Sequence, residues 1–324
     1  MERWLALVLA GMTLPATAQV GVPSPAPAAA PGVSPVTLPD ELPAGVGDEL
    51  DFLTAEDRMT VPVEIAGAGP FPFIIDTGAQ RSVISRQLAA HLGLPRGRRV
   101  RLVAMAGTSD VDTVIIPAIT VSPRPVGSVG GERIEAPALE ARHLGAPGML
   151  GIDTLQGQAL TIDFDSQRMQ VTPSSKRERL KREPGEIVIQ ARSLFGQLVV
   201  TSATVAGRRV RVVLDTGTSV SLGNLALRRL LSGRRGETTM LTSVLGVQLA
   251  ADYALLPEMT LGPAKIRSLP IAFADAAPFR VFGIDDKPAL MLGMDALRLF
   301  RRVHIDFANR ELRLLLPRDL RYSG

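Results

Sequence analysis

Short apolar runs separated by glycine-rich turns dominate the pattern of hydrophobic and polar positions along the chain. Residues 61–65 and 203–205 lead through such turns into two further apolar runs, 73–75 and 212–214, and each of these stops at an aspartate. Runs of this length, rich in β-branched and aromatic residues and bounded by glycine, predict strands. The chain is therefore expected to be mostly β.

Two short helices and a hairpin complete the predicted pattern. Helices are expected over 85–92 and 223–231, and Ser85 is a suitable N-cap for the first of them. Residues 303–307 and 311–315 flank a short polar turn and predict a β-hairpin. The second half of the chain is expected to close with this hairpin.

The apolar pattern occurs twice. The run Phe73-Ile74-Ile75-Asp76-Thr77-Gly78 matches Val212-Val213-Leu214-Asp215-Thr216-Gly217, with an offset of 215 − 76 = 139 residues. Later, Met149-Leu150-Gly151 matches Met291-Leu292-Gly293, with an offset of 293 − 151 = 142. The other matching landmarks are Gly107 with Gly246, Pro117 with Pro257, and 162–164 with 305–307. Landmarks that keep their order and spacing indicate two tandem copies of one unit.

Composition divides the chain further. A length of 324 residues with 46% hydrophobic and 21% charged residues is typical of a globular protein with two domains. An apolar run from Trp4 to Leu14 behind a charged start, followed by Ala16-Thr17-Ala18, predicts a signal peptide and hence export to the periplasm or the medium. The expected organisation is signal peptide 1–18, proline- and alanine-rich linker or propeptide 19–50, first lobe 51–173, charged interlobe linker 174–186, second lobe 187–318 and tail 319–324.

The same composition disfavours several classes of protein. The chain has no cysteine, and its three histidines are far apart, so no disulfide, thiolate chemistry or metal site is expected. Its net charge is only +4 and its basic residues are scattered outside 176–182, which argues against nucleic-acid binding. No apolar run after the signal segment reaches the length of a membrane helix, so no membrane span is expected once that segment is cleaved.

A strand that delivers Asp-Thr-Gly into a turn places a carboxylate at the end of a rigid element, and two such motifs in register indicate more than a pair of ordinary turns. Over residues 59–171 and 197–316 the sequence resembles the retropepsin and pepsin clan of aspartic peptidases, and 291–306 is similar to the retropepsin domain of the DNA-damage-inducible proteins. The resemblance implies an all-β dominated fold. Two tandem retropepsin-like β-barrel lobes with short helices would form a pseudo-twofold, bilobal, pepsin-like architecture.

The resemblance also implies roles for particular residues. Asp76 and Asp215 would be catalytic, one from each lobe, in an aspartic endopeptidase that needs no cofactor. The residues expected to support the active-site loops are Thr77, Gly78, Ala79, Thr216, Gly217 and Thr218, and those expected to back them are Gly151 and Gly293. Hairpins around Gly107 and Gly246 would act as flaps over a polypeptide substrate. With both halves in one chain, a monomer is expected.

Two carboxyl groups held close together cannot both ionise cheaply, so the pair is expected to share a proton. Ala79 follows the first motif and Thr218 the second. A hydroxyl that bonds the carboxylate favours its charged form, and on that basis we hypothesise that Asp215 is the ionised partner and Asp76 the protonated one. Four further aspartates repeat between the halves, Asp153, Asp163, Asp295 and Asp306, and capping or turn roles are expected for them.

Two other functions are compatible with the sequence. The first is a peptide-binding module that kept the fold and lost turnover, although both Asp-Thr-Gly motifs are intact. The second is a basic envelope protein that binds anionic polymers through residues 176–182.

Overall fold

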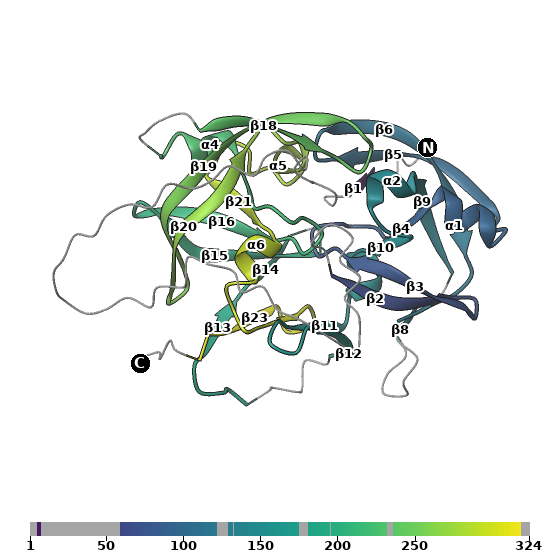
Figure 1. Ribbon diagram of the computed structural model, residues 1–324, viewed down its shortest axis with the longest axis horizontal. Helices are drawn as coiled ribbons and strands as arrows, with labels where there is room; N and C mark the ends of the chain where they lie inside the picture. The colour runs from purple at the N-terminus through teal and green to yellow at the C-terminus, as the bar shows by residue number, and fades with distance from the viewer. Residues whose placement is uncertain are drawn as a thin grey trace.

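The computed structural model describes residues 5–7, 59–121, 129–131, 133–174, 181–194, 196–231 and 236–318. These residues form three β-sheets and short helices, which confirms the expectation of a mostly β chain (Figure 1). Most of the predicted signal peptide, the proline-rich segment and the tail lie outside the described residues, and those boundaries stay predictions. Among the described residues, no helix is both long and apolar enough to cross a bilayer.

The first half of the chain builds a ten-stranded sheet, drawn on the right of Figure 1. In spatial order its strands are β1 (Leu5–Leu7), β5 (Arg96–Ala104), β6 (Gly107–Ile116), β9 (Ile134–Leu139), β4 (Val83–Ser85), β10 (Gly148–Leu150), β3 (Ala68–Ile75), β2 (Thr60–Ile65), β7 (Ile119–Val121) and β8 (Val129–Gly131).

The second half builds an eight-stranded sheet, on the left of the same view. Its strands, again in spatial order, are β14 (Arg192–Leu194), β15 (Gln197–Val205), β16 (Arg208–Leu214), β21 (Ala289–Leu292), β17 (Leu222–Gly223), β20 (Ala264–Phe273), β19 (Gln248–Leu261) and β18 (Glu237–Thr242).

The two halves repeat the same strand pairing around the aspartates. β3 runs parallel to β10, with Ile75 opposite Leu150, and β16 runs parallel to β21, with Leu214 opposite Leu292. β4 and β17 pair antiparallel to the other edges of β10 and β21. Strands buried on both faces are continuously apolar, as 73–75 and 212–214 are, because neither face meets water. The repeat in the sequence is therefore a repeat in the structure.

The helices are short and occupy matching places in the two halves. They are α1 (Arg86–His91), α2 (Ala141–Leu144), α3 (Ile152–Leu155), α4 (Leu225–Arg228), α5 (Ala277–Val281) and α6 (Met294–Leu297). The Ser85 hydroxyl accepts a hydrogen bond from Leu88 N, which confirms it as the N-cap of α1. The predicted start of the second helix at Gly223 is wrong, because Gly223 belongs to β17 and Asn224 caps α4 by accepting from Leu227 N.

A third sheet joins the halves, and we call it the interlobe sheet (lower part of Figure 1). Its strands are β12 (Arg168–Pro173), β11 (Gln158–Asp163), β22 (Arg302–Asp306), β23 (Glu311–Leu315) and β13 (Glu186–Gln190). β11 of the first half pairs with β22 of the second, and β22 pairs with β23 in the predicted closing hairpin. Leu160, Ile162, Val303 and Ile305 all point from this sheet into the main apolar core.

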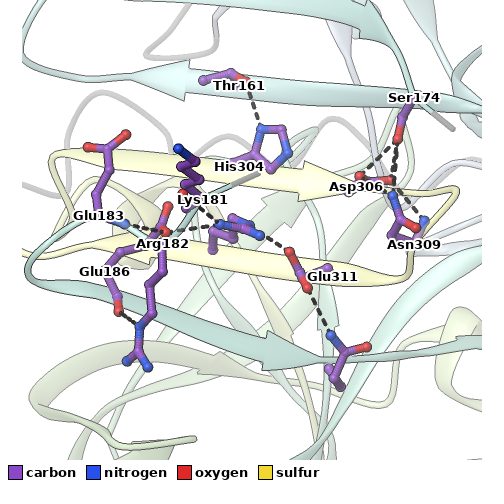
Figure 2. Close-up of polar contacts among 12 residues, drawn as sticks. Thr161, Ser174, Lys181, Arg182, Glu183, Glu186, His304, Asp306, Asn309 and Glu311 are labelled. Atoms are coloured by element: carbon purple, nitrogen blue, oxygen red, sulfur yellow. Dashed lines mark hydrogen bonds and ion pairs between the residues drawn. The ribbon is translucent and has the colours of Figure 1, made fainter. Parts of the chain in front are cut away.

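The opposite face of the interlobe sheet carries buried polar side chains (Figure 2). Arg313 bonds Glu186 at 3.1 Å and Glu311 at 2.5 Å, and it also donates to the main-chain carbonyl of Lys181. Its side chain is only 7% exposed and that of Glu186 only 5%. The segment that leads into β13 is thus fixed across the sheet by charge-assisted hydrogen bonds.

Arg313→Met tests this anchorage. The substitution leaves Glu186 buried without its main cation, and we expect it to lower the free energy of unfolding in urea by about 3–5 kcal/mol. Arg318→Met is the matched control, because the Arg318 side chain is 77% exposed and its ion pair within the described part of the chain is a long one, to Asp165 at 3.6 Å. The control should cost no more than about 1 kcal/mol. Equal stability of the two variants would show that the cluster does not anchor the segment.

Candidate active site

Two main-chain hydrogen bonds place the two aspartates of the repeated motif. The strands β3 and β16 end at Ile75 and Leu214, one residue before each aspartate. Asp76 N donates to Leu150 O at 2.9 Å, and Asp215 N donates to Leu292 O at 3.0 Å. The parallel neighbour strand therefore fixes the point at which each chain leaves its sheet and turns.

The threonines of the two motifs bond to each other's loops across the boundary between the halves. Thr77 Oγ1 donates to Leu214 O at 2.9 Å, and Thr216 Oγ1 donates to Ile75 O at 2.7 Å. Thr77 N donates to Thr216 Oγ1 at 3.2 Å, and Thr216 N donates to Thr77 Oγ1 at 3.1 Å. The structure thus brings the two predicted loops together, and each threonine supplies hydrogen bonds to the loop of the opposite half.

The carboxyl groups of Asp76 and Asp215 lie at the centre of this arrangement and are both 0% exposed. Asp76 Oδ1 accepts from Gly78 N and Ala79 N, each at 2.9 Å, and Asp215 Oδ1 accepts from Gly217 N at 3.0 Å. A Cβ added to Gly78 would lie 2.7 Å from Asp215 Cγ, and one added to Gly217 would lie 2.6 Å from Asp76 Oδ2. Only glycine leaves room for the opposite carboxyl group.

The hydrogen bond expected from the Thr218 hydroxyl to the Asp215 carboxylate is not formed. This hydroxyl donates to Val220 O at 2.8 Å and is used within its own turn. Burial, and after it the nearby charge of Asp76, raise the pKa of Asp215 well above its usual value. Main-chain amides donate to both carboxyl groups, those of Gly78 and Ala79 to Asp76 and those of Gly217 and Thr218 to Asp215, and they favour the charged form of each. The pair therefore keeps a proton to a higher pH than an exposed aspartate does.

Behind each loop, the predicted glycines make room for a serine. A Cβ on Gly151 would lie 2.9 Å from Ser82 N, and one on Gly293 would lie 3.0 Å from Ser221 N. Gly151 N donates to the Ser82 hydroxyl at 2.9 Å, and Gly293 N donates to that of Ser221 at 3.0 Å. The backing segment is thus bonded to the chain that leaves the active-site loop.

Asp153 and Asp295 complete this layer, and the sequence reasoning left them out of the site. Ser82 donates to Asp153 Oδ1 from its main-chain N at 2.8 Å and from its hydroxyl at 2.7 Å. Ser221 donates in the same way to Asp295 Oδ2 at 2.9 Å and Oδ1 at 2.6 Å. The sequence did contain a signal for this layer, because each serine lies six residues after the aspartate of its Asp-Thr-Gly motif: 82 − 76 = 6 and 221 − 215 = 6.

The other two repeated aspartates have the turn role that was expected. Asp163 accepts from Ser166 N and Asp306 accepts from Asn309 N, each closing a turn.

Burial, opposed by the bonds to Ser221, raises the pKa of Asp295 to about 6, and burial also raises the pKa of Asp153. No group of histidine, aspartate and glutamate side chains within the described ranges is arranged to hold a metal ion.

Two hairpins, β5–β6 and β18–β19, each pack their tip against the opposite half. Met105, between β5 and β6, lies in an apolar cluster with Val213 and Met291, and its carbonyl accepts from Ala277 N at 3.1 Å. Val244, between β18 and β19, lies in a cluster with Ile74. Figure 1 shows both hairpins along the upper edge of the molecule. The predicted flap glycines, Gly107 and Gly246, lie at the tips of these hairpins.

Two related β-rich halves, each giving an Asp-Thr-Gly loop to one buried centre, define a bilobal acid-protease type of fold. A family model described as "Aspartyl protease" matches residues 61–154 and 201–296, which together make up more than half of the chain. The chain belongs to this family. The two matched segments fall in the two halves, which confirms the expectation of two retropepsin-like lobes.

A solved structure is also similar. It is the crystal structure of a retropepsin-like aspartic protease from Rickettsia conorii, with 21% sequence identity and a TM-score of 0.28. The match covers 42% of this chain and 95% of that one. No curated protein matches the chain.

The pKa of Asp295 predicts a dependence of stability on pH. Because the folded chain holds this proton more tightly than the unfolded chain, Asp295 stabilises the fold below pH about 4, and the contribution is lost as pH rises through about 6. Asp295→Asn removes the titration. Urea unfolding between these two pH values should therefore show wild type losing up to about 3 kcal/mol more than Asp295→Asn. The exposed Asp286→Asn is the control and should follow wild type. Parallel curves for all three proteins would contradict the prediction.

Proposed function

We propose that this member of the aspartyl protease family is an aspartic endopeptidase that hydrolyses peptide bonds of polypeptide substrates. The observation that carries the proposal is the pair of buried carboxyl groups, Asp76 and Asp215, held face to face by the crossed threonine bonds. A pair that shares one proton offers a base and an acid at the same place, which is what addition of water to a carbonyl requires.

In the proposed reaction Asp76 is the ionised member of the pair, and Asp215, whose pKa is raised by burial and by the charge of Asp76, is the protonated one. Ionised Asp76 takes a proton from a water molecule as the water oxygen bonds to the carbonyl carbon of the peptide. Protonated Asp215 gives its proton to the carbonyl oxygen, so a neutral diol forms. Asp76 then returns its proton to the peptide nitrogen as the carbon–nitrogen bond breaks, and Asp215 regains its proton as the new carboxyl group forms. No cofactor or metal takes part in this proposal.

The proposed enzyme works as a monomer, because one chain supplies both aspartates and both covering hairpins. Enclosure by the hairpins removes the pair from bulk water, where electrostatic interactions are weaker. A peptide must displace the tips at Met105 and Val244 to reach the aspartates. The alternative proposal is a catalytically inactive peptide-binding module of the same fold, and variants of the two aspartates distinguish it from the enzyme.

The two aspartates are tested by Asp76→Asn and Asp215→Asn. Each variant should cleave denatured casein at least about 1,000-fold more slowly than wild type, because the base or the acid is lost. Peptides are mapped by mass spectrometry from acid to neutral pH, and circular dichroism checks folding. The exposed Asp286→Asn should cleave like wild type. Equal peptide patterns from all four proteins, or no cleavage by wild type, would favour the binding module.

We further propose that the chain is exported, to the periplasm or the medium, with cleavage of residues 1–18. The charged start, the apolar run to Leu14 and the small residues Ala16-Thr17-Ala18 support this. The mature protein recovered outside the cytoplasm should begin near Gln19 when its N-terminus is determined by mass spectrometry. Retention of Met1 on exported protein would instead indicate an anchor.

A further inference from the structure

Gln197 brings a second-half side chain to the first active-site loop. It is the first residue of β15 and is 0% exposed. Its Nε2 donates to Gly78 O at 3.0 Å, across the boundary between the halves. Gly78 is the residue whose N–H bonds Asp76 and whose Cα faces the Asp215 carboxyl group. The carboxamide thus bonds directly to the peptide unit that positions the aspartates.

The oxygen of this carboxamide has no hydrogen-bond donor in the described part of the chain. Gln197 Oε1 is buried and accepts no hydrogen bond from any described residue. A buried acceptor without a donor typically costs about 1–3 kcal/mol, so a core position would favour an apolar residue of the same size. The turn before it is also tightly fitted, since a Cβ on Gly196 would lie 2.6 Å from Ile152 Cγ2 of the first half. The side chain is therefore held in place with a buried acceptor that no described donor satisfies.

A carboxamide has the same donor and acceptor as a peptide group. With its donor fixed on Gly78, Gln197 presents an acceptor beside the loop where the scissile peptide must lie. We propose that Gln197 is a substrate-positioning residue whose Oε1 accepts a main-chain N–H of the bound peptide while its Nε2 holds the Gly78 carbonyl. This inference rests on the proposed peptidase function and adds a residue outside both Asp-Thr-Gly motifs to the binding site.

The test is a double-mutant cycle between Gln197 and the substrate main chain. The probe is a peptide that spans the most readily cleaved bond of oxidised insulin B chain, with each N–H near that bond replaced in turn by N-methyl. At one position N-methylation should lower kcat/KM of wild type by about 10-fold or more, and that of Gln197→Met hardly at all. Gln197→Met removes an unpaired buried acceptor but also the donor to Gly78 O, so its free energy of unfolding should change by no more than about 1–3 kcal/mol, and circular dichroism checks that the variant is folded.

Gln158→Met is the matched control, because Gln158 Oε1 is likewise buried without a described donor but belongs to the interlobe sheet. This control should respond to N-methylation as wild type does. A purely structural Gln197 would slow cleavage of every peptide by the same factor, with no coupling at any position, and that result would overturn the proposal.

Failure of the proposed function gives a different outcome. If wild type cleaves nothing, the binding of intact oxidised insulin B chain to wild type and to Gln197→Met is compared by calorimetry. Binding at least about 10-fold weaker in the variant would retain the role of Gln197 in a binding module. Equal binding, or none, would overturn it.

Discussion

The crossed hydrogen bonds between Thr77 and Thr216 are the constraint on which the rest of the structure depends. Each hydroxyl donates to a carbonyl of the opposite strand and accepts from the opposite threonine amide, so neither loop is complete alone. These bonds are buried, and a buried hydroxyl or amide left without its partner is costly. The two halves are consequently locked in one relative position, and the two carboxyl groups take their mutual placement from it.

Locking the loops together forces two carboxyl groups into the interior, and several other features follow from that. Burial disfavours charge on both groups, so a shared proton and the main-chain amides that bond Asp76 and Asp215 become necessary. Gly78 and Gly217 become necessary as well, because each backbone passes against the opposite carboxyl group. Ser82 with Asp153, and Ser221 with Asp295, then hold the chain behind each loop, where water cannot replace a missing bond.

The sequence alone was sufficient to predict the main features that occur in both halves of the chain. The matched motifs around Asp76 and Asp215 predicted their meeting, since two copies of one unit can share a site only at their common boundary. Serine and aspartate at fixed distances from each motif also repeat, but spacing does not tell which side chain a carboxylate faces. The direction of the Thr218 hydroxyl was likewise undetermined, because Val220 O and the Asp215 carboxylate both lie within reach of its turn. Gln197 has no counterpart in the first half among the described residues, so the internal repeat did not indicate its role.

The unrepeated features decide the chemistry. Two identical loops would bind one proton with equal preference on either side, whereas hydrolysis needs one defined base and one defined acid. In this chain the symmetric bonds of Thr77 and Thr216 set the distance between the carboxyl groups, and burial together with the charge of Asp76 raises the pKa of Asp215. Among the described residues, the Gln197 side chain hydrogen-bonds the first loop, at Gly78 O, and has no counterpart at the second. A peptide is itself directional, from its amino to its carboxyl end, so an acceptor on one side of a nearly symmetric centre can orient the peptide relative to base and acid.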